Sequence, residues 1–190
     1  EIDKYASKSY SIIHNVSEEL NLGDITKIDI SKLKDFDLVT HGSPCQDFSL
    51  LKVKGKGLEG DKSKLFYEYL RILKEVKPKY FLLENVRMKE DSKKQLDKYL
   101  SVEGRYINSI DFSFQNRPRF YWTNINILPY EAKNISFQDY KDTDEEYCDK
   151  FKVKPTMSRL RMWNNGEGKN SIGSCANVTN SEKVYCLTRK

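Results

Sequence analysis

A strand, an amphipathic helix and a second strand follow one another early in this chain, and this order limits the fold more than any other feature. Residues 36–41 (Phe-Asp-Leu-Val-Thr-His) are apolar and partly β-branched, which predicts a buried strand. Residues 79–84 predict a second strand. Residues 63–77 between them predict a helix, with apolar side chains at helical spacing on one face at Leu65, Tyr69, Ile72, Leu73 and Val76. This alternation predicts an α/β domain.

The rest of the chain extends this pattern and then loses it. Residues 3–18 and 91–100 predict helices, residues 46–60 a loop, and residues 107–114 and 119–125 a strand pair around two arginines. After about residue 133 the composition shifts toward Asn, Ser, Lys and Gly without a clear period. We therefore expect one region at residues 1–132 and a second at residues 133–190.

Cys45 lies in a Pro-Cys turn directly after the first predicted strand. A free cysteine is commonly a buried small hydrophobe. In an open α/β sheet, however, ligands and chemistry gather beyond the carboxyl ends of the strands. Pro44 also stiffens the approach to this thiol. On this stretch alone, packing and nucleophilic catalysis both remain open.

Composition excludes several classes of protein. No apolar run approaches the length of a membrane span, and the first residues lack the apolar core of a signal peptide, so we expect an intracellular protein. The four cysteines form no C-x-x-C pair and only two histidines accompany them, which argues against a zinc site and against a disulfide framework. We expect no metal and no membrane partner.

Charge alone does not identify a partner. The net charge is +5, from 33 basic and 28 acidic residues, which is mild for a nucleic-acid-binding protein. Lys52, Lys54 and Lys56 form either a solvated loop or a segment that meets phosphates. Residues 142–146 are acidic and are expected on a solvent face, whereas residues 157–163 and 174–179 are candidates to face DNA.

Three motifs in order resemble those of the cytosine-C5 DNA methyltransferases. They are Pro44-Cys45-Gln46, Glu84-Asn85-Val86, and Gln115-x-Arg117-x-Arg119. Gly23-Asp24-Ile25 and the opening Glu1-Ile2-Asp3 are similar to further motifs of that family. The Ser-Pro-Cys-x-Asp-x-Ser form is similar to the animal de novo branch and to phage relatives, which suggests a phage or prophage origin.

The resemblance implies an α/β, Rossmann-like methyltransferase fold that lacks its first strand and uses S-adenosyl-L-methionine, with part of a small irregular target-recognition region at residues 133–190. It implies catalytic roles for Cys45, Glu84, Arg117 and Arg119, and cofactor contacts for Glu1, Ile2, Asp24, Ile25, Pro44 and Leu65. It implies DNA contacts for Ser49, Lys52, Lys54, Lys56, Arg159 and Arg161, and pocket-organising roles for Gln46, Asn85 and Gln115. Double-stranded DNA is the implied partner, in the cytoplasm of a bacterial or phage-infected cell.

These residue types suit the chemistry that the resemblance implies. Cytosine C5 becomes nucleophilic when a thiolate adds to C6, and Cys45 would supply that thiolate. Glu84 would donate at N3, for which its pKa must be raised by burial. Arg119 or Arg117 would stabilise charge at O2. No residue is identified as the base that removes the C5 proton, and the target base must be flipped out of the duplex.

Some family motifs have no match here. The glycine-rich loop that precedes the acidic residue matched by Glu1 is absent, as is a late Arg-x-Leu-Thr segment. In that family glycine lets the backbone approach the cofactor closely. We therefore expect the 190-residue chain to bind the cofactor poorly alone and to need missing segments, or a second chain, for activity.

Three readings of the function remain open from the sequence. The chain is the central part of a DNA methyltransferase, a remnant that at most binds DNA, or a tRNA methyltransferase. Cys186-Leu187-Thr188 is only loosely similar to the Cys-Phe-Thr segment of the tRNA branch, which argues against the third reading.

Overall fold

The structure is a computed structural model that describes residues 1–33, 35–44, 65–151, 157 and 182–185. These residues belong to two compact units. The first comprises Glu1–Tyr106 and Arg119–Ile127, and the second comprises Ile107–Pro118 and Leu128–Lys190. Within the described residues, no helix has the length and apolar character that crossing a membrane requires.

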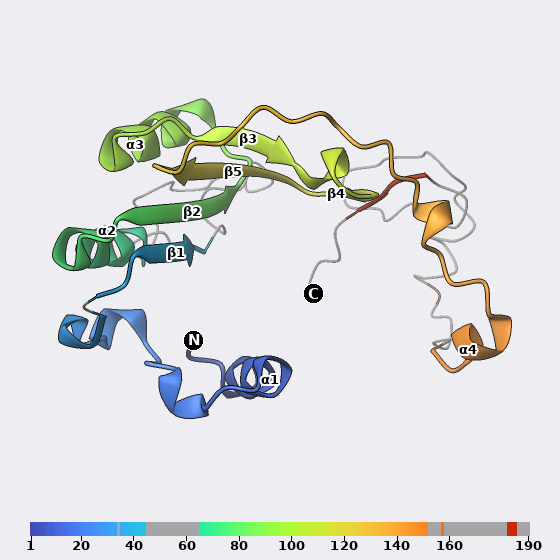
Figure 1. Ribbon diagram of the computed structural model, residues 1–190, viewed down its shortest axis with the longest axis horizontal. Helices are drawn as coiled ribbons and strands as arrows, with labels where there is room; N and C mark the ends of the chain where they lie inside the picture. Colours follow the sequence, from blue (N-terminus) through green and yellow to red (C-terminus); the bar gives the residue numbers. More distant parts are fainter. Residues whose placement is uncertain (34, 45–64, 152–156, 158–181, 186–190) are drawn as a thin grey trace. The chain divides into compact units, whose positions relative to one another are not determined.

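A four-stranded sheet organises the first unit, in the order β1-β2-β5-β3 (Figure 1). The strands are β1 (Leu38–Gly42), β2 (Tyr80–Val86), β5 (Pro118–Thr123) and β3 (Arg105–Asn108). β1 and β2 run parallel, with Gly42 beside Glu84, whereas β2 and β5 run antiparallel, with Glu84 beside Tyr121. The carboxyl ends of β1 and β2 therefore lie together at one edge of the sheet.

Helices α2 (Leu65–Val76) and α3 (Glu90–Leu100) pack on the same face of this sheet. The buried core joins the two helices to β2 and β5 and contains Phe66, Tyr69, Leu83, Met88, Leu96, Leu100 and Trp122. The predicted helices at 63–77 and 91–100 are confirmed. The predicted apolar face of α2 omitted Phe66, which is fully buried, whereas Leu65 is half-buried.

The N-terminal helix is shorter than predicted. α1 spans Lys4–His14 rather than residues 3–18. The Asp3 side chain caps its start, and Asn15 ends it in the left-handed conformation, at a φ of 50°, with its amide donating to the Ser11 carbonyl. Short 3-10 turns follow, namely η1 (Glu18–Leu20), η2 (Ile25–Lys27) and η3 (Ile30–Leu33). Asparagine tolerates the left-handed region better than most residues, which explains the early stop.

The predicted strand over 107–114 is wrong beyond Asn108. The Asn108 side chain accepts from the amides of Ile110, at 3.3 Å, and Arg117, at 2.9 Å. It thereby caps a 3-10 turn, η5 (Ser109–Asp111). A capping side chain that offers the backbone another partner ends the strand there.

The second unit holds β4 (Gln115–Asn116) and β6 (Val184–Tyr185), which pair in parallel. It also holds η6 (Phe137–Asp139) and the short helix α4 (Glu145–Asp149). The ring of Phe114 contacts those of Phe137 and Tyr140, with centroids 5.3 and 5.5 Å apart. The acidic residues 142–146 are all solvent-exposed, as the sequence predicts.

Asp97 of α3 joins three separate parts of the first unit. Its carboxylate accepts from Trp122 Nε1 of β5 at 2.6 Å, from the Gly104 amide at 2.9 Å, and from Lys93 Nζ at 2.8 Å. Burial alone would raise the pKa of this carboxyl, but the hydrogen bonds from Lys93, Gly104 and Trp122 hold its pKa below its usual range. A Cβ at position 104 would lie 2.4 Å from the Trp122 ring, so only glycine fits there.

Replacing Asp97 by alanine is expected to lower the free energy of unfolding by about 3–5 kcal/mol, because the buried Lys93 ammonium loses its main partner and the Trp122 N–H loses its acceptor. Urea unfolding at neutral pH measures this loss. Asp91→Ala, at an exposed position on the same helix, is the matched control and should cost about 0.5 kcal/mol or less. Equal losses in the two variants would contradict the structural role of Asp97.

Candidate active site

Glu84 and Arg119 form an ion pair at the end of the central strands. Arg119 Nε lies 2.6 Å from Glu84 Oε1, and the two side chains are 17% and 32% exposed respectively. The strand register explains the contact. Glu84 lies beside Tyr121 and Val86 beside Arg119, so Arg119 is a diagonal neighbour of Glu84 on the same sheet face. Two of the predicted site residues, distant in sequence, therefore meet.

The end of β1 lies against the same carboxylate. A Cβ built at Gly42 would be 3.5 Å from Glu84 Oε2. The buried Asn85 side chain donates to Ser43 Oγ at 2.8 Å and more weakly to the Ser43 carbonyl at 3.4 Å. These bonds tie the end of β2 to the residues that lead to Pro44. Cys45 follows Pro44 in the sequence, but it lies outside the described residues.

Glu1 lies beside the loop that leads to Asp24. Asn21 Nδ2 donates to the Glu1 carbonyl at 2.9 Å, and the Gly23 amide donates to Asn21 Oδ1 at 3.0 Å. Gly23 has a φ of 76°, a conformation that favours glycine. This arrangement carries two carboxylate side chains on neighbouring backbone segments.

Asp24 is the cap of η2. Its Oδ1 accepts from the Thr26 amide at 3.0 Å and from the Thr26 hydroxyl at 2.8 Å. The amide hydrogen bond, then the hydroxyl, hold the pKa of Asp24 below its usual range, with a smaller contribution from Lys27. Ile25 and Leu65 are half-buried, whereas Ile2 is 79% exposed.

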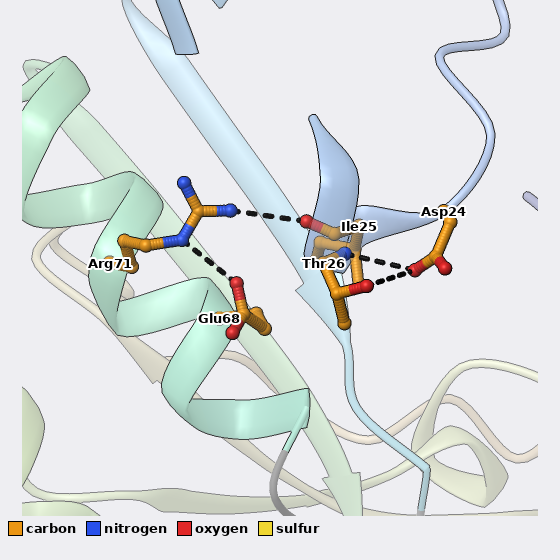
Figure 2. A network of polar contacts seen from close by, with 5 residues as sticks. All are labelled: Asp24, Ile25, Thr26, Glu68 and Arg71. Atoms are coloured by element: carbon orange, nitrogen blue, oxygen red, sulfur yellow. Dashed lines mark hydrogen bonds and ion pairs between the residues drawn. The ribbon is translucent and has the colours of Figure 1, made fainter. Parts of the chain in front are cut away.

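Helix α2 is tied to this acidic turn by a contact that the sequence analysis missed. Arg71 donates from Nη2 to the Ile25 carbonyl at 3.2 Å and from Nε to Glu68 Oε2 at 2.8 Å (Figure 2). The spacing of Glu68 and Arg71 indicates a helical ion pair. Nothing in that spacing indicates a bond to Ile25.

The remaining predicted site residues fall into two groups. Gln115 and Arg117 belong to the second unit, where the Arg117 carbonyl accepts from the Ser109 amide at 3.3 Å and the Gln115 carbonyl accepts from Ser109 Oγ at 2.7 Å. The others lie outside the described residues and are Cys45, Gln46, Ser49, Lys52, Lys54, Lys56, Arg159 and Arg161. Their roles stay predictions.

A cavity of about 510 Å³ lies along α1 and η1, lined by Glu1, Ala6, Ser7, Tyr10, Ser11, Val16, Ser17, Leu20 and Asn21. Of the predicted site residues that the structure describes, only Glu1 lines it. In the part of the chain that the structure describes, no group of three or more His, Cys, Asp or Glu side chains could hold a metal ion.

His41 supports β1 from the face opposite Glu84. Its ring stacks on Tyr69 of α2, with centroids 4.8 Å apart and planes 13° apart. Burial lowers the pKa of His41 from 6.5 to about 4 and raises the pKa of Tyr69. His41 is therefore neutral at pH 7 and packs as an apolar ring beneath the strand that leads to Cys45.

Because the folded-state pKa of His41 lies below its unfolded value, its neutral form contributes stability above pH 6.5 that is lost as the pH falls toward 4. The loss is expected to be on the order of 3 kcal/mol. Urea midpoints of His41→Phe should fall less steeply over this range than those of the wild type. His14→Gln, which changes the exposed histidine, is the control and should keep the wild-type slope. If the urea midpoints of His41→Phe and the wild type fell equally steeply with pH, His41 would not be the buried neutral group that causes the loss.

The fold of this chain is shared with a solved structure. The chain is similar to the crystal structure of the S. pombe Dnmt2 methyltransferase, with a TM-score of 0.60 and 20% sequence identity over 87% of this chain and 57% of that one. The predicted Rossmann-like methyltransferase fold is confirmed, and its sheet is mixed because β5 runs antiparallel to β2.

The sequence then identifies the family. The sequence-family model of the C-5 cytosine-specific DNA methylases matches residues 1–171. The chain therefore belongs to this family. It is 54% identical over 87 residues to the orphan methyltransferase M.Rho11sI of Bacillus phage rho11s, covering 46% of this chain and 17% of that protein. It is 38% identical over 153 residues to the type II methyltransferase M1.ScrFI of Lactococcus lactis subsp. cremoris, covering 75% of this chain and 36% of that protein. The chain thus spans about a sixth to a third of these relatives.

Proposed function

We propose that this chain carries the catalytic centre of a DNA (cytosine-5)-methyltransferase that uses S-adenosyl-L-methionine and acts through a covalent bond between Cys45 and cytosine C6. The observation that carries the proposal is the Glu84–Arg119 pair, held against the end of β1. Cys45 follows that strand end in the sequence. A thiol, a carboxyl group and a guanidinium are the groups that addition to a cytosine ring requires.

Each group has one task on a cytosine flipped out of the duplex. The Cys45 thiolate adds to C6, which raises the electron density at C5. Glu84 donates a proton at N3, and the Arg119 guanidinium stabilises the charge that develops at O2. Arg117 is the alternative cation. When bound, S-adenosylmethionine supplies the electrophilic methyl group. A base, which can be water, then takes the C5 proton, the Cys45–C6 bond breaks to return the thiolate, and N3 gives its proton back to Glu84.

The cofactor residues are proposed from the acidic loop and its neighbours. Glu1 accepts from the ribose hydroxyls and Asp24 from the adenine amine. Ile2, Ile25 and Leu65 form apolar walls, and Pro44 completes the site. The Asn21 side chain supports this assignment, since it bonds the Glu1 carbonyl and the Gly23 amide and so holds the backbone segments of Glu1 and Asp24 together.

The remaining assignments concern DNA and the pocket. The residues proposed to contact double-stranded DNA are Ser49, Lys52, Lys54, Lys56, Arg159 and Arg161. The basic side chains among them would contact its phosphates. Gln46, Asn85 and Gln115 are proposed to organise the pocket, and the bond from Asn85 to Ser43 supports that role. Residues 1–132 would form the catalytic core and residues 133–190 part of the target-recognition region, in a cytoplasmic enzyme.

Transfer of a radiolabelled methyl group tests the proposal. The complete enzyme should label duplex DNA that contains cytosine, and should not label a duplex without cytosine or tRNA. Labelling of tRNA alone would favour a tRNA methyltransferase. Binding of duplex DNA without any transfer would favour a catalytically inactive remnant. Either result would overturn the proposal.

A further inference from the structure

Arg71 connects two elements that the proposed cofactor site uses. It lies on α2, the helix that begins at Leu65, and its Nη2 donates to the Ile25 carbonyl at 3.2 Å across 46 residues of sequence (Figure 2). Its Nε simultaneously donates to Glu68 Oε2 at 2.8 Å. The Arg71 and Glu68 side chains are 33% and 28% exposed, so the contact lies partly within the fold.

The Ile25 carbonyl belongs to the turn that presents Asp24. Ile25 is the first residue of η2, and Asp24 is its cap. Asp24 Oδ1 accepts from the amide and hydroxyl of Thr26, so this oxygen is fixed by the turn. Asp24 Oδ2 is the oxygen that makes no bond to Thr26 (Figure 2). It lies 3.7 Å from Lys27 Nζ. Any movement of the Ile25 backbone would therefore carry the Asp24 carboxylate with it.

A guanidinium suits this connection better than an ammonium. Its planar fork donates in two fixed directions at once, here to a carbonyl and to a carboxylate. Glu68, on the same helix, balances the charge of Arg71 and orients the fork. Lysine would present a single point charge on a flexible stem and could not fix both directions.

We infer that Arg71, oriented by Glu68, is a positioning residue for the adenine end of the cofactor site, which sets the Asp24 turn relative to the start of α2. This inference rests on the proposed function, because it takes adenosine as the ligand. Arg71 touches neither the base nor the methyl group. It acts through Asp24, whose carboxylate recognises the 6-amino group, and through the spacing between Ile25 and Leu65.

Selectivity for adenine over hypoxanthine distinguishes a positioning role of Arg71 from a purely structural one. S-adenosylhomocysteine offers a 6-amino donor to Asp24, whereas its inosine analogue offers a 6-oxo acceptor that a carboxylate rejects. The wild-type enzyme should prefer the adenine compound by at least about tenfold. If Arg71 sets the position of Asp24, its loss must reduce this preference as well as the affinity.

Calorimetric titration of the complete enzyme with both compounds is the test. Arg71→Met should weaken binding of S-adenosylhomocysteine by about tenfold, the order expected for a hydrogen bond from a charged donor. Arg71→Met should also reduce the preference for S-adenosylhomocysteine over its inosine analogue to about threefold or less. Glu68→Gln should act in the same direction with a smaller effect. Arg71→Lys, which keeps one donor, should fall between Arg71→Met and the wild type.

Lys74→Met, at an exposed position one turn further along α2, is the matched control and should bind like the wild type. If Arg71→Met binds weakly but keeps the full preference for adenine, Arg71 merely supports the fold and the inference fails. Unchanged binding by both Arg71→Met and Glu68→Gln overturns it equally. A wild-type enzyme that binds neither compound would overturn the proposed function itself, and the inference with it. If Arg71→Met does not fold, the preference of Glu68→Gln and of Arg71→Lys for the adenine compound over the inosine analogue tests the inference instead.

Discussion

Replacing Cys45 by serine is expected to abolish methyl transfer, with turnover falling by at least about 1,000-fold while duplex DNA still binds. A serine hydroxyl is far less acidic than a thiol, so it supplies almost no anion to add to C6 at neutral pH. The contacts to phosphates do not depend on the thiol. A loss confined to turnover is therefore the signature of a nucleophile.

Duplex DNA containing 5-fluorocytosine measures the bond directly, because fluorine at C5 cannot leave as a proton and the adduct accumulates. The wild-type enzyme should form a covalent complex that survives denaturing electrophoresis, and Cys45→Ser should form none. Cys148→Ser is the matched control, since Cys148 is a partly exposed free thiol whose Sγ lies 3.8 Å from the Asp142 carbonyl. Equal adduct yields from Cys45→Ser and the wild type would remove Cys45 from the mechanism.

The regular elements that position this site were predictable because their patterns are local. The helical spacing of Tyr69, Ile72 and Leu73 predicts α2 almost to its ends, and the apolar runs before Gly42 and Glu84 predict β1 and β2. Both runs end where the candidate residues begin, so the sequence predicts a site beyond the carboxyl ends of these strands.

Contacts between distant residues were not predictable from such patterns. The periodicity of α3 does not indicate that Asp97 accepts from Trp122, nor that Gly104 faces that ring. The predicted strand pair around Arg117 and Arg119 did not show that Asn108 would end the first strand, or that β5 would run antiparallel beside β2. That antiparallel register brings Arg119, rather than a neighbouring residue, to Glu84.

The same limit applies to the residues proposed to bind the cofactor. Gly23-Asp24-Ile25 predicts a turn with a carboxylate, but its attachment to α2 depends on Arg71, whose partner is 46 residues away. Asn21 is a further residue that sequence reasoning missed, although its side chain bonds both Glu1 and Gly23. Asparagine in a loop is common, so its residue type gave no signal of this role.

Replacing Glu84 by glutamine is expected to lower turnover by about 100- to 1,000-fold and to leave duplex DNA affinity within about threefold of the wild type. Glutamine keeps the shape of the side chain, but it cannot release a proton to N3 as the ring gains charge. Arg119→Met is expected to show the same division between turnover and affinity, because the charge at O2 develops only during the reaction.

The double variant distinguishes a cooperating pair from two separate residues. Arg119 Nε lies 2.6 Å from Glu84 Oε1, so removal of either side chain disturbs the other. Glu84→Gln with Arg119→Met should therefore lose much less than the product of the two single losses. Single-turnover rates with saturating DNA measure this coupling, and Glu75→Gln, at the exposed end of α2, is the control. Fully multiplicative losses of turnover would mean that Glu84 and Arg119 act on the base independently. Losses of DNA affinity instead of turnover would mean that neither residue takes part in the reaction.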